Sequence, residues 1–135
     1  MPQRSRAAPE ESILTASRNP RRGEIWTAYL AEPKRHWVVV VSLDSRNLSE
    51  RTTSVLIVPF GGYGAGGPTT LELFPTETGL PEASYLKGHF IQVLDKDNLI
   101  ERMPRTLSTA RMKQVVEIIR RAVDPDTTAV GRIAR

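Results

Sequence analysis

The sequence contains no cysteine, and only 6% of its 135 residues are aromatic. Without cysteine the chain can have no disulfide framework, no thiolate-ligated zinc or iron–sulfur cluster, and no cysteine nucleophile. Long hydrophobic runs are also missing: the longest uninterrupted apolar run is Trp37–Val41, far short of a membrane span. The Arg-bearing start, MPQRSRAAPEES, is followed by no hydrophobic segment of the signal-peptide kind. We therefore expect a soluble, cytoplasmic protein.

Histidine is also scarce, the two residues being His36 and His89. Neither lies in an H-x-x-x-H or H-E-x-x-H spacing, and a zinc site would need both together with distant carboxylates. The glycine-rich segment 61–67 satisfies G-x-G-x-x-G, but a strand-like segment follows it where a dinucleotide-binding motif requires a helix. We interpret it as a mobile hairpin loop, with substrate gating as the alternative, and we expect neither a metal nor a cofactor.

The remaining composition is that of one globular domain, with 39% hydrophobic and 25% charged residues. The sequence pI is about 9.8, but the basic residues are concentrated at the two ends. Residues 1–22 carry a net charge of +3, residues 23–101 carry −4, and residues 102–135 carry +5. This pattern does not indicate a uniform phosphate-binding surface. We expect a flexible arm over 1–22, a folded domain over 23–123 and a flexible tail over 124–135.

Hydrophobic patterning within the domain predicts several short strands. EIWTAYLA places Trp26, Ala28 and Leu30 on one face, and HWVVVVSL is typical of a strand buried on both faces. SVLIVPF predicts a third strand, TTLELF a fourth with Leu71 and Leu73 on one side, and SYLKGHFIQVLD one or two more. Such closely spaced strands favour a small barrel or sandwich over a parallel sheet.

A C-terminal amphipathic helix is predicted between Ser108, which can cap its start, and Asp124-Pro125, which stops it. Its expected buried stripe follows the i, i+3, i+4, i+7 spacing and comprises Met112, Val115, Val116, Ile119, Ala122 and Val123.

Two small groups of residues suggest chemistry. Lys87 and His89 would point to the same face of a strand, where an imidazole suits acid–base work and a cation can stabilise negative charge on a phosphate. Lys34, Arg35 and His36 form a short basic cluster before the buried run. A solvated strand residue and a charged turn are the plain alternatives.

Five strings occur in an order and spacing that resemble the MazF/PemK family of toxin endoribonucleases across residues 21–123. They are R-G-E-I-W, a V-V-S strand ending in D-x-x-N, a third strand with V-P near its end, G-L-P-x-x-S…D-K-x-x-L, and L-S-x-x-R-M before the helix. The resemblance implies a mainly β fold with a C-terminal α-helix, an SH3-like barrel of the CcdB/PemK/MazF type. It also implies a homodimer, a cognate antitoxin protein, and metal-independent cleavage of single-stranded RNA through the ribose 2′-OH.

Aligned on these strings, the site positions depart from the family pattern. The basic residue that opens the second strand becomes His36, with Arg35 beside it, and Gly61 replaces a hydroxyl residue. The family's Asp becomes His89, and its RNA-contacting Gln becomes Phe90. Ser84 is retained.

From this alignment we expect catalytic and RNA-binding roles for seven residues. His89 would act as general base or acid, and His36 would supply the complementary proton transfer. Arg35 and Lys87 would stabilise the pentacovalent phosphate. The RNA-binding residues would be Ser84, Gln92 and Lys34.

Two other functions remain open from the sequence. The first is a non-catalytic growth inhibitor that binds a protein, RNA or DNA target on the same barrel, as a gyrase poison does. The second is a degenerate barrel with neither activity.

Overall fold

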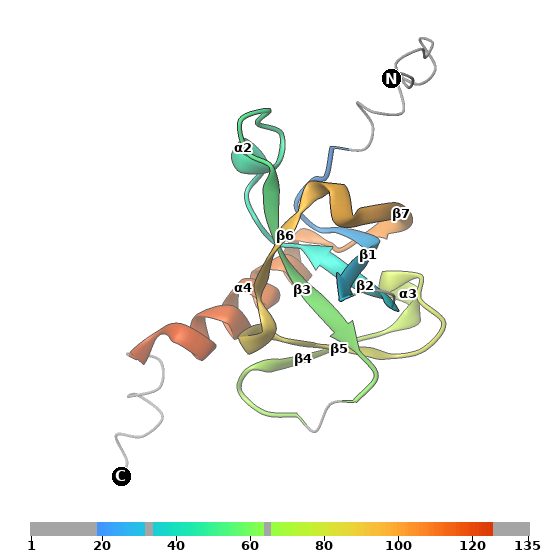
Figure 1. The fold of residues 1–135 in the computed structure, drawn as a ribbon. Coiled ribbons are helices and arrows are strands. Elements are labelled where there is room, and N and C mark those ends of the chain that lie inside the picture. Colours follow the sequence, from blue (N-terminus) through green and yellow to red (C-terminus); the bar gives the residue numbers. More distant parts are fainter. Residues whose placement is uncertain (1–18, 32–33, 64–65, 126–135) are drawn as a thin grey trace.

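The computed structural model describes residues 19–31, 34–63 and 66–125, and the predicted arm, the predicted tail and the middle of the glycine-rich loop lie largely outside them (Figure 1). In chain order the elements are β1 (Glu24–Ala31), β2 (Lys34–Val40), α2 (Asp44–Asn47), β3 (Ser54–Gly61), β4 (Thr70–Leu73), α3 (Pro75–Thr78), β5 (Ser84–Lys87), η2 (Gly88–Phe90), β6 (Gln92–Asp95), η3 (Lys96–Asn98), β7 (Leu99–Thr106) and α4 (Thr109–Val123). None of the helices in these described ranges is long and apolar enough to cross a membrane.

The strands form one antiparallel, strongly bent sheet with the order β4-β5-β3-β2-β1-β7, in which β6 also pairs with β3. One edge of β3 serves two partners, because residues 54–57 pair with β6 and residues 60–61 pair with β5. A strand shared in this way lets the sheet curve, as in a small barrel. The predicted fold class, mainly β with a C-terminal helix, is confirmed.

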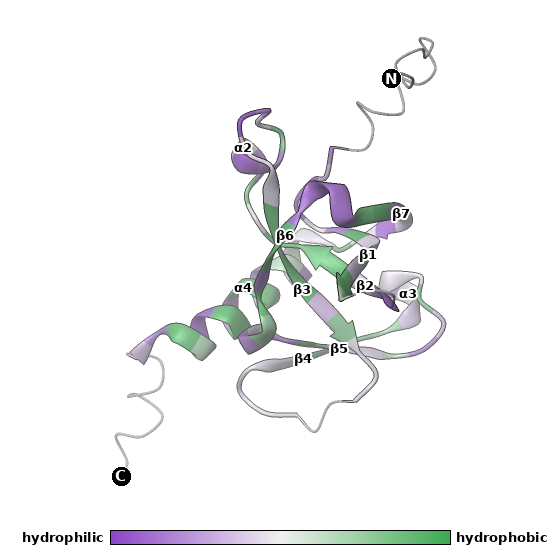
Figure 2. Ribbon diagram, viewed as in Figure 1, coloured by the Kyte–Doolittle hydropathy of each residue, from purple (hydrophilic) through white to green (hydrophobic). Residues whose placement is uncertain are grey.

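The valine run of β2 separates two hydrophobic clusters. Val38 and Val40 pack with Trp26 in one cluster, whereas Val39 and Val41 face the cluster that α4 covers. The prediction of a strand buried on both faces is therefore confirmed. Figure 2 shows the hydrophobic residues along the central strands and the hydrophilic residues around α2.

Helix α4 begins as predicted, with the Ser108 hydroxyl accepting a hydrogen bond from the backbone N–H of Arg111 at 3.1 Å. Its buried stripe differs from the prediction: Ile118 is buried at 4% exposure, while Val116 and Val123 are 37% and 69% exposed. The cause is the approach of η2, which packs against the helix backbone at Ile118. This contact centres the buried face on Met112, Val115 and Ile118.

The D-x-x-N string forms a buried polar network after β2. The Ser42 hydroxyl donates to Asn47 Oδ1 and accepts from the N–H of Leu56, while Asn47 Nδ2 donates to the Ser42 carbonyl and to Asp44 Oδ1. Asp44 Oδ1 also accepts from the N–H of Arg22 at 2.7 Å. Because Asn47 is fully buried, its amide has to be satisfied by these partners. The string therefore holds α2 against the start of the domain.

The R-G-E-I-W string has a structural role as well. Gly23 has φ +91°, a left-handed conformation that favours glycine. The buried carboxylate of Glu24 accepts from the Trp26 indole N–H at 3.0 Å and from the N–H of Arg21 at 2.9 Å. These contacts fix the entry of the chain into β1.

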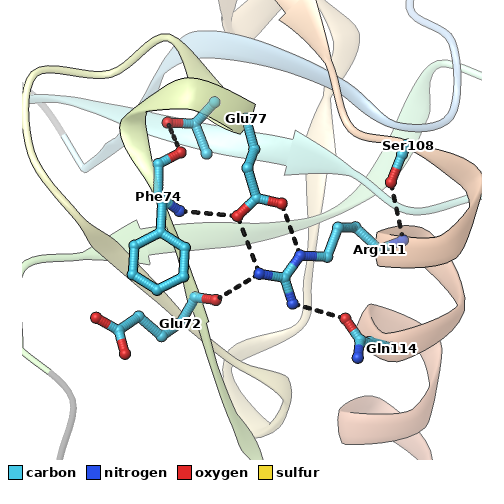
Figure 3. Close-up of polar contacts among 7 residues, drawn as sticks. Glu72, Phe74, Glu77, Ser108, Arg111 and Gln114 are labelled. Atoms are coloured by element: carbon cyan, nitrogen blue, oxygen red, sulfur yellow. Dashed lines mark hydrogen bonds and ion pairs between the residues drawn. The ribbon is translucent and has the colours of Figure 1, made fainter.

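The L-S-x-x-R-M string ties α4 to α3 through an ion pair (Figure 3). Arg111 Nε and Nη2 donate to the two carboxylate oxygens of Glu77 at 2.7 and 2.9 Å, and Nη1 donates to Gln114 Oε1 at 2.7 Å. Glu77 also accepts from the N–H of Phe74 at 3.0 Å. These hydrogen bonds, those from Arg111 above all, lower the pKa of Glu77 from its ordinary value of 4.5 and outweigh partial burial, which raises it.

We expect Glu77→Gln to reduce the free energy of unfolding by about 1 kcal/mol at neutral pH, because a two-pronged, partly buried ion pair is lost. A carboxyl group whose pKa is lowered on folding stabilises the protein above 4.5, and the contribution disappears as the pH falls through the folded-state pKa. Urea denaturation of both proteins from pH 7 to pH 3 should therefore show a difference that shrinks on acidification. Glu117→Gln, which breaks an exposed i,i+4 pair with Arg121, is the control and should have a smaller effect.

Candidate active site

A cavity of about 600 Å³ opens between the first half of β2, the end of β3 and the loop that precedes β5. Three elements supply its polar groups: β1, β2 and the segment 81–84. Its lining residues are Thr27, Arg35, His36, Trp37, Phe60, Gly61, Gly62, Pro81, Glu82, Ala83 and Ser84.

Arg35 and His36 reach this cavity because β2 begins before its buried run. In the register of β1 and β2, Arg35 pairs with Tyr29 and His36 with Ala28. The Arg35 guanidinium lies 5.8 Å from the centre of the Tyr29 ring, a cation–π contact that orients it while it stays exposed. A permanent cation and an imidazole thus line the same cavity, as charge stabilisation and proton transfer at a phosphate require.

The two hydroxyl groups of the cavity are already engaged with the backbone. Ser84 is buried, and its Oγ donates to the carbonyl of Glu82 at 3.2 Å. Thr27 Oγ1 accepts from the N–H of Glu101 at 3.2 Å. Ser84 therefore holds the loop before β5 in place, and the side chain of Glu82 is exposed in that loop.

A second cavity of about 230 Å³ shares His36, Phe60, Gly61 and Gly62 with the first. It adds Leu30, Pro59, Tyr63, Tyr85, Lys87 and Phe90. The negative charge of Glu72 raises the pKa of Tyr85, and partial desolvation and the hydrogen bond from its hydroxyl to Glu72 at 3.3 Å act in the same direction. His36 lies where the two cavities meet, with Arg35 on one side and Lys87 on the other.

The predicted pairing of Lys87 with His89 on one strand face is wrong. Strand β5 ends at Lys87, and residues 88–90 form the 3₁₀ turn η2. The His89 ring turns to Thr69, with 3.0 Å between Nδ1 and Oγ1, and it lines neither cavity. The alternation of side chains that the prediction assumed holds only in extended backbone.

Two predicted RNA-binding residues also lie apart from both cavities. Lys34 is exposed at the start of β2. Gln92 is exposed on β6, where its Nε2 donates to the carbonyl of Phe90 at 3.1 Å. Of the seven predicted residues, the first cavity thus gathers Arg35, His36 and Ser84, and the second adds Lys87.

Sequence reasoning missed Glu82 and Thr27, which line the first cavity. Glu82 occupies a variable position of the G-L-P-x-x-S string, so the string does not reveal it. Thr27 lies on a strand with alternating apolar and polar residues, and its cross-strand partner Trp37 also lines the cavity. Within the described ranges, no three His, Asp or Glu residues are grouped as a metal site requires.

Several solved structures have the same fold as this chain. An endoribonuclease in complex with its cognate antitoxin from a mycobacterial species superimposes with a TM-score of 0.66 and 23% identity, over 77% of this chain and 94% of that one. An endoribonuclease from a mycobacterial species superimposes with a TM-score of 0.65 and 24% identity, over 78% of this chain and 91% of that one. The Mycobacterium tuberculosis toxin MazF-mt6 superimposes with a TM-score of 0.65 and 20% identity, over 75% of this chain and 96% of that one. These likenesses show a shared fold.

Sequence comparison gives the family. No curated protein matches the chain. The family model of the PemK-like, MazF-like toxins of type II toxin–antitoxin systems does match, over residues 21–123. The match covers the sheet and α4, including the five strings and both cavities, and the chain therefore belongs to the PemK-like, MazF-like toxin family.

Proposed function

We propose that this chain is an endoribonuclease toxin that cleaves single-stranded RNA without a metal ion and thereby inhibits growth. The observation that carries the proposal is the placement of Arg35 and His36 in one cavity, with Lys87 beyond His36 in the adjoining one. Solved structures with this fold are described as endoribonucleases, which supports the same activity here.

In the proposed reaction the ribose 2′-OH attacks the neighbouring phosphorus, and the bond from phosphorus to the 5′-oxygen of the next nucleotide breaks. The 2′-OH gives up a proton, and the departing 5′-oxygen takes one. The products are a 2′,3′-cyclic phosphate and a free 5′-OH. Atoms balance without water or a metal ion, so the protein has to supply one base, one acid and positive charge for the pentacovalent phosphate.

We assign these roles to the groups that line the first cavity. Arg35 carries a positive charge and presents several donors to the non-bridging oxygens of the phosphate. His36 carries out one proton transfer, and Glu82, the carboxylate in the same wall, carries out the other. Lys87 adds positive charge from the adjoining cavity. This assignment gives Glu82 the role that the sequence alone gave to His89.

Two further properties belong to the same proposal. One similar structure is a complex with a cognate antitoxin, which supports an antitoxin partner for this chain. The basic ends of the sequence suit an acidic antitoxin segment. We also propose a homodimer that acts in the cytoplasm.

The proposal is tested by incubating the purified protein with a long single-stranded RNA in the presence of EDTA and sequencing the new 5′ ends. We expect discrete cleavage sites, fragments with 5′-OH ends, and less cleavage where the same sequence is annealed to its complement. Intact RNA under all conditions would refute the ribonuclease proposal.

Gly61 and Gly62 favour a second candidate function, because they leave this part of the cavity wall without a hydroxyl group. A growth inhibitor that captures its target without cutting it would leave RNA intact while expression still arrests growth. That combination would select the binding function over the enzyme.

A further inference from the structure

The second cavity has aromatic walls. Phe60 and Tyr63 come from the end of β3 and the residues after it, Tyr85 from β5, and Phe90 from η2. Tyr63 is 85% exposed and Phe90 49% exposed. Aromatic rings that are open to solvent at the edge of a cavity offer flat faces to a ligand.

Phe90 is held in position by the backbone around it. Gly88 packs so closely on α4 that a Cβ there would overlap the carbonyl of Ile118. The N–H of Gly88 donates to the carbonyl of Thr69 at 2.8 Å, and Gln92 Nε2 donates to the carbonyl of Phe90. An exposed ring on a fixed backbone can bind a flat ligand at a small cost in conformational entropy.

Positive charge lies over one of these rings. Lys87 Nζ is 5.8 Å from the centre of the Phe90 ring, and His36 closes the cavity toward Arg35. The Tyr85 hydroxyl donates its hydrogen to Glu72, so toward a ligand it can act only as an acceptor. The cavity combines stacking surfaces with cations and has few groups that distinguish one base from another.

We propose that the second cavity binds an unstacked nucleobase of single-stranded RNA, with Phe90 as the main stacking surface and Tyr63 as the second. This inference rests on the proposed function, because the base belongs to a nucleotide whose phosphate lies in the Arg35 and His36 cavity. The two cavities share His36, Phe60, Gly61 and Gly62, so a phosphate in the first and a base in the second would belong to neighbouring positions of one strand. Stacking tolerates all four bases, so affinity at this position depends on the presence of a base more than on its identity.

The test uses the full-length protein and 2′-O-methyl oligonucleotides of twelve residues, which lack the attacking hydroxyl and stay intact. One probe is a pool of random base sequence, and the other is abasic throughout. Fluorescence anisotropy gives Kd for the unsubstituted protein, Phe90→Leu, Tyr63→Leu and Phe90→Trp. Phe74→Leu is the matched control, because Phe74 is 46% exposed and lines neither cavity.

We expect Phe90→Leu to weaken binding of the random pool by roughly 5- to 100-fold and to leave the Kd of the abasic probe unchanged. Phe90→Trp should retain binding, and Phe74→Leu should have no effect. An unchanged Kd for the random pool, or an equal loss for both probes, would overturn the stacking site.

Binding of the pool without cleavage of ordinary RNA would refute the ribonuclease proposal and leave the stacking site standing. RNA cleavage at an unchanged rate in Phe90→Leu would support the ribonuclease proposal and overturn the stacking site. Binding of an antitoxin peptide that depends on Phe90, with RNA binding unaffected, would assign the surface to a protein partner instead.

Discussion

His36→Ala is expected to lower the rate of RNA cleavage by about 10²- to 10⁴-fold, the usual contribution of a positioned acid or base. His36 lies where the two cavities meet, so it is the imidazole that can reach a phosphate held by Arg35. His89→Ala should stay within a few-fold of the unsubstituted protein, because its ring lies outside both cavities, in contact with Thr69 and edge-to-face with the Phe90 ring. Initial rates on one fluorescent single-stranded RNA measure both effects.

The histidine comparison is controlled by thermal unfolding of each variant, since His36 is only partly buried on its strand and the substitution should leave Tm nearly unchanged. Arg35→Lys is a useful companion. It keeps the charge but loses the planar donor pattern, so cleavage should fall with little change in stability. A large loss in His89→Ala together with full activity in His36→Ala would reverse the roles assigned here.

Gly88→Ala is expected to reduce the free energy of unfolding by about 3 kcal/mol, the upper part of the usual range for overpacking. The added methyl group would meet the backbone of α4 at Ile118 and Ile119, not the end of a flexible side chain. Backbone cannot yield by changing rotamer, so η2 and the helix have to separate. Denaturant titration followed by tryptophan fluorescence measures the loss.

Gly62→Ala is the matched control for the glycine prediction, because a Cβ at Gly62 has no heavy atom within 4 Å. Its stability should stay close to that of the unsubstituted protein. Equal stabilities for Gly88→Ala and Gly62→Ala would show that η2 does not pack on α4 as described.

Most of the fold can be predicted from the sequence because its strands carry strong hydrophobic patterns. The valine run of β2, the alternation in β1 and the Ser108 cap each determine local structure with few competing choices. Strand β7 was missed for a physical reason. It lies at the edge of the sheet, contains Pro104 and is mostly exposed, so it shows no alternation and its proline is tolerated.

The candidate site could be predicted only in part. Arg35 and His36 precede a strand whose register is well determined, and the structure places them together. The placement of His89 depends on Gly88 meeting a helix some thirty residues further along the chain, a long-range contact that no local pattern shows. Glu82 reaches the cavity on a loop that a hydrogen bond from Ser84 holds in place. No sequence pattern indicates this position either.

Several strings that carry the family resemblance turn out to maintain the fold. Glu24, Asn47 and Arg111 each hold one segment to another through buried or partly buried hydrogen bonds. The positions that depart from the family pattern, among them His36, Gly61 and Phe90, line the two cavities. The scaffold is thus shared with the family, and the departures lie at the candidate site.

The central claim is that RNA is cut by its own 2′-OH in the cavity of Arg35 and His36. The most direct measurement takes an RNA with one mapped cleavage site and replaces the nucleotide on the 5′ side of that site with its 2′-deoxy form. In EDTA, the all-ribose RNA should be cleaved to a 2′,3′-cyclic phosphate and a 5′-OH, while the RNA with the single deoxy substitution should stay intact at that position. Equal cleavage of both substrates would contradict the account.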